Sequence, residues 1–139
     1  LGYGESILLS QLWYNTNMDK ERRPIHWVGS SEKDLSSLPR PVKRRIGHAL
    51  HLAQIGDKSE NAKPLKGLGP GVFEEVADYD GDTFRAVYTV RLSSGVYVLH
   101  CFQKKSKHGI ETPKKEINLI KQRLAEAIEQ DKRAKEKRP

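Results

Sequence analysis

The chain is poor in the residue types on which several classes of protein depend. Cys101 is the only cysteine among its 139 residues, so no disulfide can form within the chain and an oxidising compartment is not needed. No stretch approaches the ~20 consecutive apolar residues of a membrane-spanning helix, and we expect no membrane partner. The length is that of one ordinary domain, and 36% of the residues are hydrophobic and 31% are charged.

Negative charge is also scarce. The 25 Lys and Arg residues outnumber the 18 Asp and Glu residues, which gives a net charge of +7 and a pI near 9.5. A basic domain of this size favours anionic partners, and a nucleic acid is the partner that this charge predicts. The alternative is that the charge serves solubility alone.

The first seventeen residues differ from the rest. They carry one charged residue, Glu5, and a short apolar run without the basic flank or cleavage site of a signal peptide. We interpret residues 1–17 as a non-native or flexible extension; a packed segment is the alternative. Met18 then begins a single domain over residues 18–130, and residues 131–139, which are nearly all charged, are expected to form a flexible tail.

The hydrophobic pattern predicts an α+β fold with a small antiparallel sheet of about four strands and helices packed on one face. Ile25–Val28 is expected to be an edge strand, and a meander follows later in the chain. Its three strands are Val72–Tyr79, Thr83–Leu92 and Val96–Lys104, with the first turn at Asp80-Gly81-Asp82.

Three helical segments complete the predicted fold. Asp34 or Ser36 is expected to cap a helical turn, and apolar residues at helical spacing predict a helix from Pro41 to Gly56. A final helix should begin at Pro113 with Thr112 as its N-cap.

The strand Thr83–Leu92 alternates clearly between apolar and polar residues. If Ser94 and Gly95 form a two-residue turn, Thr89 lies opposite His100, Arg91 opposite Val98, and Arg85 opposite Lys104. A three-residue turn would bury Lys104, which is costly. The first register collects four side chains on an exposed face: Arg85, Arg91, His100 and Lys104.

This face resembles a phosphate-binding surface in its chemistry. Arginine binds phosphate in a bidentate manner, lysine supplies a point charge, and histidine transfers protons near neutral pH. The loop lysines Lys63 and Lys66 and the cluster Lys104–His108 add further positive charge. The alternative is an ordinary solvated sheet face. Two cations opposite each other disfavour folding, so Arg85→Ala is expected to leave the fold intact.

No cofactor or metal is expected. His48 and His51 are three residues apart on a predicted helix, but no cysteine or acidic residue completes a ligand set. Lys66-Gly67-Leu68-Gly69 lacks the Gly-Lys-Ser/Thr ending of a nucleotide-binding loop.

Four segments together resemble the phage-derived HigB-like branch of the RelE/ParE toxin superfamily. They occur in the expected order between about Ile25 and Glu129, and they are Ala62–Glu75, Phe84–Tyr88, Leu99–Lys105 and Thr112–Ile117. The resemblance implies a RelE-like fold and the toxin of a type II toxin–antitoxin pair. It also implies a helix-turn-helix, HigA-like antitoxin as partner, mRNA and the ribosome as targets, and a cytoplasmic location.

The resemblance further implies an activity and its residues. RelE-like toxins cut ribosome-bound mRNA without a metal, by attack of a 2′-hydroxyl on the adjacent phosphate. Arg85 matches the arginine that stabilises the transition state, Lys104 and Lys105 match the lysines that end the last strand, and Lys66 matches the loop lysine. Further phosphate contacts are expected from Arg91, Lys107 and His108.

Two questions stay open at this point. The Asp-Tyr-His ending of the better-known HigB enzymes is missing, so His100, Tyr88 and His108 are all candidates for the general base. The superfamily also contains ParE-like inhibitors of DNA gyrase, and an inactive regulatory phage-derived protein is a third possibility.

Overall fold

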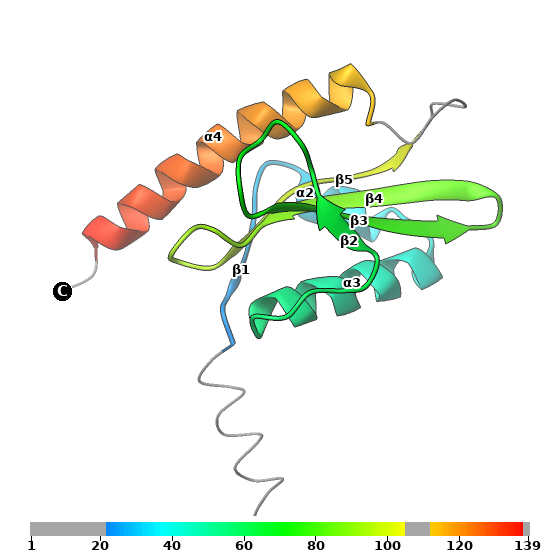
Figure 1. Ribbon diagram of the computed structural model, residues 1–139, viewed down its shortest axis with the longest axis horizontal. Helices are drawn as coiled ribbons and strands as arrows, with labels where there is room; N and C mark the ends of the chain where they lie inside the picture. The colour runs from blue at the N-terminus through cyan, green and yellow to red at the C-terminus, as the bar shows by residue number, and fades with distance from the viewer. Residues whose placement is uncertain (1–21, 105–111, 138–139) are drawn as a thin grey trace, which may run out of the picture.

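The computed structural model describes residues 22–104 and 112–137 (Figure 1). In chain order they form β1 (Ile25–Trp27), α2 (Ser31–Ser36), α3 (Arg40–Gln54), β2 (Ala62–Pro64), β3 (Val72–Tyr79), β4 (Asp82–Thr89), β5 (Val96–Lys104) and α4 (Lys114–Glu136). The α+β class is confirmed, and the arrangement is consistent with a RelE-like fold. The proposed extension, residues 1–17, lies outside the described residues.

The strands form one mixed sheet in the order β1-β5-β4-β3-β2. The four strands β2 to β5 pair antiparallel, whereas β1 runs parallel to β5. The sheet has five strands where about four were predicted, and the prediction that it is antiparallel is wrong only for β1. β2 escapes sequence analysis because it contributes three residues within a stretch rich in proline and glycine, and a strand as short as β1 carries no signal of its direction.

Asp80 and Gly81 connect β3 to β4 in a two-residue turn, at the position predicted. Tyr79 pairs with Asp82, and the two turn residues have φ values of 52° and 80°. Positive φ at both positions is the requirement of the tight hairpin turn that an Asp-Gly pair favours.

The connection from β4 to β5 is longer than predicted. β4 ends at Thr89 and β5 begins at Val96, so Ser94 and Gly95 do not form a two-residue turn. The predicted register is wrong as a result, and Thr89 lies opposite Tyr97.

The change of register alters the partner of Arg85. Phe102 lies opposite Arg85, and Lys104 lies opposite Thr83. Arg85 and Lys104 still share one face of the sheet, because directly opposed residues point to the same side and Thr83 is two residues from Arg85.

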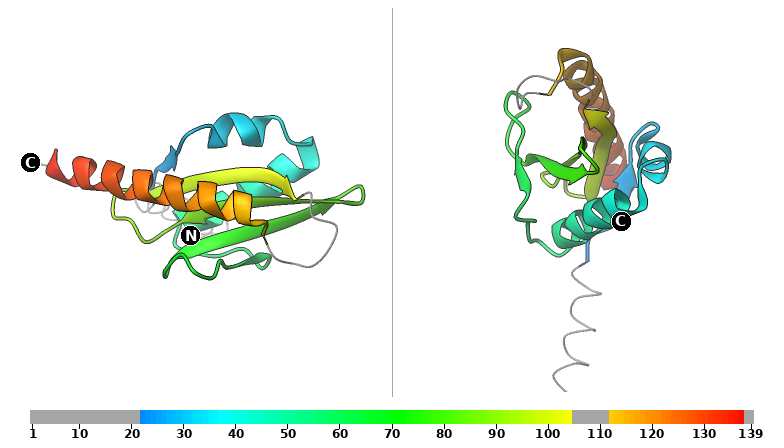
Figure 2. Two further views of the ribbon diagram at one scale, coloured as in Figure 1. Left: turned by 90° about the horizontal axis from the view of Figure 1, so that it is seen from above. Right: turned by 90° about the vertical axis from the view of Figure 1, so that its right-hand side faces the viewer.

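Helices cover both faces of the sheet (Figure 2). Ile120, Leu124 and Ala127 of α4 pack on one face, called here the α4 face. Val42, Ile46 and Leu50 of α3 pack on the other, the α3 face. The prediction that helices cover one face is therefore wrong. Burial on both sides also explains why the first four residues of β5, Val96–Leu99, are all apolar rather than alternating with polar residues.

The helix ends differ from the prediction in three places. α2 begins at Ser31 rather than after Asp34 or Ser36. Thr112 is not the N-cap of α4, because its hydroxyl donates to Glu74 of β3. α4 continues to Glu136, so the expectation of a frayed tail is wrong for residues 131–136. The helix predicted between Pro41 and Gly56 agrees with α3.

Within the described ranges, no helix combines the length and the apolar character needed to cross a lipid bilayer.

Candidate functional site

A buried ion pair between Arg85 and Glu74 lies on the α4 face. Nη1 of Arg85 is 3.0 Å from Oε1 of Glu74, and the two residues are only 3% and 2% exposed. Glu74 is the diagonal neighbour of Arg85 across the β3–β4 pair, because Val76 lies directly opposite Arg85. The arginine predicted to bind phosphate is therefore held by a carboxylate of the protein itself, under α4 rather than on an exposed face.

Thr112 joins this ion pair to the start of α4. Its hydroxyl oxygen accepts a hydrogen bond from Nη1 of Arg85 at 2.9 Å and donates to Oε2 of Glu74 at 2.6 Å. The three side chains form a polar triad that ties the beginning of α4 to the sheet. Neither Glu74 nor Thr112 is among the site residues predicted from the sequence.

A cavity of about 430 Å³ opens beside the triad. Its walls come from β2 and the following loop, from β3 and from the start of α4, and they consist of Lys63, Pro64, Leu65, Lys66, Glu74, Thr112 and Ile117. Lys63 and Lys66 are exposed, and neither forms an ion pair with another residue of the described part of the chain. Ammonium groups without a carboxylate partner are suited to binding phosphate.

Lys104 ends β5 on this same face, half-buried, and contributes a further cation near Arg85. Lys105, Lys107 and His108 lie outside the described residues. Among the described residues, no three His, Cys, Asp or Glu side chains are arranged to hold a metal ion.

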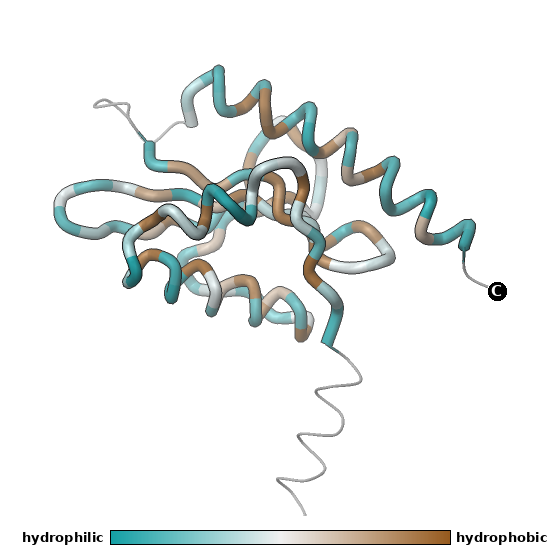
Figure 3. The backbone as a smooth tube through the Cα atoms, turned by 180° about the vertical axis from the view of Figure 1, so that it is seen from behind, coloured by the Kyte–Doolittle hydropathy of each residue, from teal (hydrophilic) through white to brown (hydrophobic). Residues whose placement is uncertain are grey.

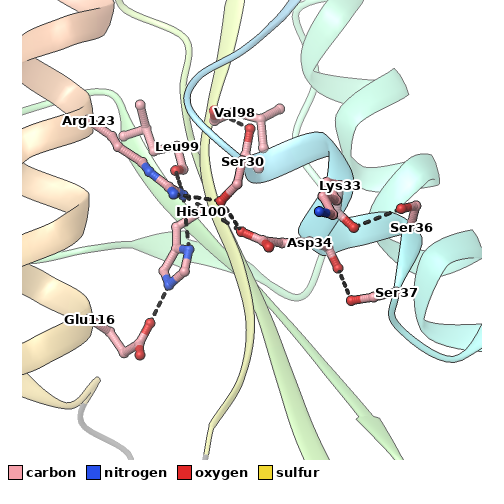
Figure 4. Close-up of polar contacts among 11 residues, drawn as sticks. Ser30, Lys33, Asp34, Ser36, Ser37, Val98, Leu99, His100, Glu116 and Arg123 are labelled. Atoms are coloured by element: carbon pink, nitrogen blue, oxygen red, sulfur yellow. Dashed lines mark hydrogen bonds and ion pairs between the residues drawn. The ribbon is translucent and has the colours of Figure 1, made fainter.

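His100 also lies on the α4 face, but both of its ring nitrogens are engaged (Figure 4). Nη1 of Arg123 is 3.2 Å from Nδ1, and Nε2 is hydrogen-bonded to the carboxylate of Glu116. Because a guanidinium can only donate, Nδ1 accepts and the ring proton is on Nε2. The lone pair that a general base would use is therefore occupied by Arg123.

Arg123 links three elements around this histidine. It donates to the carbonyl oxygen of Leu99 at 2.9 Å and to Oγ of Ser30, which in turn donates to Asp34 of α2 (Figure 4). Leu99 is the extra residue of a β-bulge in β5, so Arg123 satisfies a carbonyl at an irregular point of the sheet. Sequence analysis missed Arg123, although its helical spacing from Ile120 indicates a position facing the sheet.

Two other predicted site residues lie apart from Arg85. Tyr88 packs on the α3 face, where burial and the negative charge of Glu75 raise the pKa of its hydroxyl to about 12. Arg91 is exposed beyond the end of β4, beside Gly69 and Gly71. The structure therefore places Arg85 and Lys104 on one face of the sheet and Lys66 at the cavity beside Glu74, the partner of Arg85, whereas Tyr88 and Arg91 lie elsewhere.

Comparison with known proteins gives one family. The model of the family described as "Phage derived protein Gp49-like (DUF891)" matches residues 33–125, about two thirds of the chain. The matched range contains every residue that lines the cavity beside the triad. No curated protein matches the chain.

Proposed function

Because the chain belongs to the Gp49-like family of phage-derived proteins, which are toxin–antitoxin toxins related to RelE/ParE-like toxins, we propose that it is an mRNA-cleaving toxin. The finer assignment is to the HigB-like branch, whose partner would be a helix-turn-helix antitoxin. The observation that carries the proposal is the cavity beside Arg85 and Glu74, with two lysines at its rim.

The proposed reaction is an internal transesterification of RNA. The 2′-oxygen attacks the adjacent phosphorus, its proton passes to a base, and the 5′-oxygen leaves with a proton from an acid. The products are a 2′,3′-cyclic phosphate and a 5′-hydroxyl. Negative charge grows on the non-bridging oxygens in the transition state, so cations fixed beside them lower the barrier.

The basic residues that the structure describes would act on the phosphate in different ways, depending on how deeply each is buried. Lys63 and Lys66 are exposed and would bind the phosphate directly, as point charges. Arg85 is paired with Glu74 and bonded to Thr112, so it would act on the phosphate only indirectly, by holding these two cavity-lining residues in place. Lys104 would add a cation from the end of β5. Lys105 and Lys107 keep the phosphate-binding roles that the sequence predicts for them.

The proposal also narrows the choice of general base. Tyr88 lies on the opposite face of the sheet, and Nδ1 of His100 is occupied by Arg123. His108 is therefore the candidate that the proposal retains from the three predicted from the sequence.

Primer extension on mRNA from cells that express the protein tests the function. Discrete cuts within translated codons are expected. An SOS response without such cuts would instead indicate the ParE-like alternative, inhibition of DNA gyrase. Growth should recover when an adjacent helix-turn-helix antitoxin gene is co-expressed.

A further inference from the structure

The outer side of α3 is rich in basic residues. The helix contains Arg40, Lys43, Arg44, Arg45, His48 and His51, and it has no acidic residue. Arg40, Arg44, His48 and His51 are exposed and follow one another at intervals of four, four and three residues. This spacing aligns them in one stripe along the helix, called here the α3 stripe, with about 6 Å between successive residues.

The stripe forms none of the direct ion pairs that basic residues form on α4. There, Lys132 lies 3.6 Å from Glu129 and Lys135 lies 3.5 Å from Asp131. Within the described ranges, no ion pair involves a residue of α3. Basic side chains that follow one another along a helix, without direct ion pairs, are the pattern of a surface that follows a phosphate backbone.

A second cavity, of about 280 Å³, lies beside the stripe. It is lined by Arg44, Arg45, His48, Ser59, Asn61 and Glu75. Consecutive strand residues point to opposite faces, so Glu75 belongs to the α3 face whereas Glu74 belongs to the α4 face. The cavity is therefore separate from the one beside Arg85, and α3 and α4 lie on opposite sides of the sheet (Figure 3).

Glu75 gives this cavity a buried hydrogen-bond acceptor. The residue is 2% exposed, and its Oε1 accepts a hydrogen bond from Oγ of Ser59 at 2.8 Å. No donor contacts Oε2 of Glu75 within the described part of the chain. This oxygen is not fully enclosed by protein either, and since Glu75 lines the cavity, we take Oε2 to be open to it. Burial raises the pKa of this carboxyl, against the Ser59 hydrogen bond and the charges of Arg45, His48 and Lys58.

We propose that the α3 stripe and this cavity form a second RNA-binding site, in which the stripe binds backbone phosphates and Oε2 of Glu75 accepts a hydrogen bond from the amino group of an inserted base. The site is specific for a strand rather than a mononucleotide, because the stripe extends over three turns of α3 and offers several phosphate-binding side chains in succession.

The acceptor at the bottom of the cavity predicts which base is preferred. Cytosine presents an N4 amino donor at the position where uracil presents the O4 acceptor. A carboxylate accepts from the first and repels the second, and a desolvated carboxylate gains most from an added donor. A cytidine-containing strand should therefore bind more tightly than the corresponding uridine strand.

Fluorescence anisotropy with the full chain and 2′-O-methyl oligonucleotides tests this site. Eight-residue cytidine and uridine oligomers are suitable probes, because a 2′-O-methyl group prevents attack by the 2′-oxygen. The result is thus independent of whether the protein cleaves RNA. We expect the cytidine oligomer to bind roughly tenfold more tightly. Replacing its bases by N4,N4-dimethylcytosine, which lacks the donor, should remove the preference without any change to the protein.

Variants separate the two parts of the site. Glu75→Gln should remove the preference for cytidine. The double variant Arg40→Ala with Arg44→Ala should weaken the binding of both oligomers and lower the salt dependence of their affinity by the equivalent of about two phosphate contacts. The control double variant Arg133→Ala with Lys137→Ala removes the same charge from the end of α4, and it should change neither the affinity for the oligomers nor its salt dependence. The proposal would be overturned if the cytidine and uridine oligomers bound equally tightly, or if cytidine monophosphate bound as tightly as the cytidine oligomer. It would also be overturned if polyglutamate competed as well as the oligomers do, a result that would point to an acidic protein partner.

Discussion

Arg85 and Glu74 form an ion pair on the α4 face, with 3.0 Å between Nη1 and Oε1 and almost no exposure of either residue. The pair has a role in the fold and a position beside the candidate site. It holds the start of α4 to the sheet through Thr112, and its carboxylate member, Glu74, forms part of the wall of the cavity that we assign to RNA. Substitutions at this pair are therefore expected to affect both folding and activity.

Arg85→Ala should destabilise the fold, contrary to the expectation from sequence. It leaves the carboxylate of Glu74 buried without its ion-pair partner, a change that costs about 3–5 kcal/mol. Chemical denaturation measures the loss, and exposed Arg91→Ala serves as a control that should change stability little. Combining Arg85→Met with Glu74→Leu should recover much of the loss, since no buried charge is then left unpaired. A fully stable Arg85→Ala variant would show that the pair has no structural role.

Asp131→Asn should weaken the attachment of α4 to the β4–β5 connection. Burial of this carboxyl raises its pKa, but hydrogen bonds from Ser94 and Ser93 and the charge of Lys135 outweigh burial and lower it to about 2. A lowered pKa stabilises the fold above the unfolded-state value of 3.8, and this contribution disappears as the pH falls toward 2.

Asp131→Asn is therefore expected to cost roughly 2 kcal/mol at pH 7 and much less near pH 2. Denaturation curves of both proteins across this range provide the measurement. The exposed Glu129→Gln variant is the matched control, and it should show no such pH dependence. A constant difference between Asp131→Asn and the parent at all pH values would contradict this account of the carboxylate.

His100 should exist as the Nε2–H tautomer at neutral pH, because the guanidinium of Arg123 donates to Nδ1. Nitrogen NMR of the imidazole rings distinguishes the two tautomers, and exposed His51 provides an unconstrained reference within the same protein. Arg123→Met should release Nδ1 and allow the tautomers to mix. Observation of the Nδ1–H form in the parent protein would be incompatible with the network around Arg123.

Gly71→Ala and Gly47→Ala should have opposite effects on stability. Gly71 has a φ of 80°, and a Cβ there would lie 2.8 Å from Cβ of Arg91, so alanine should cost about 1–3 kcal/mol. Gly47 lies within α3 with no atom within 4 Å of an added Cβ, so alanine should stabilise the helix by about 0.5–1 kcal/mol. Thermal denaturation of the two variants tests the contrast, and equal shifts would refute it.

Local sequence pattern accounts for the long strands of the meander but not for the layers. The predicted bounds of β3 and β5 agree with the structure, because apolar runs flanked by turn residues determine strand ends. The same pattern does not show which faces the helices cover. The polar side of β4 was assigned to solvent, whereas α4 covers it and Glu74 compensates the charge of Arg85.

The candidate site was only partly predictable for a similar reason. Lys66, Arg85 and Lys104 are cations within recognisable segments; Arg85 and Lys104 share one face of the sheet, and Lys66 lines the cavity beside Glu74. Glu74 and Thr112 belong to the site only because Glu74 lies across the β3–β4 pair from Arg85 and because Thr112, at the start of α4, bonds to both. Such pairings depend on register, and a longer β4–β5 connection than the expected turn changes that register.

The most direct test of the central claim is a cleavage assay with purified translating ribosomes and a defined mRNA. We predict a 5′ fragment that ends in a 2′,3′-cyclic phosphate, and no cut when the nucleotide before the scissile bond is 2′-deoxy. Lys63→Ala with Lys66→Ala should slow cleavage by at least about tenfold, corresponding to the loss of one charge-assisted contact. Lys132→Ala with Lys137→Ala, the control on α4, should not. Cleavage that survives the 2′-deoxy substitution, or that proceeds at the parental rate without Lys63 and Lys66, would contradict the account.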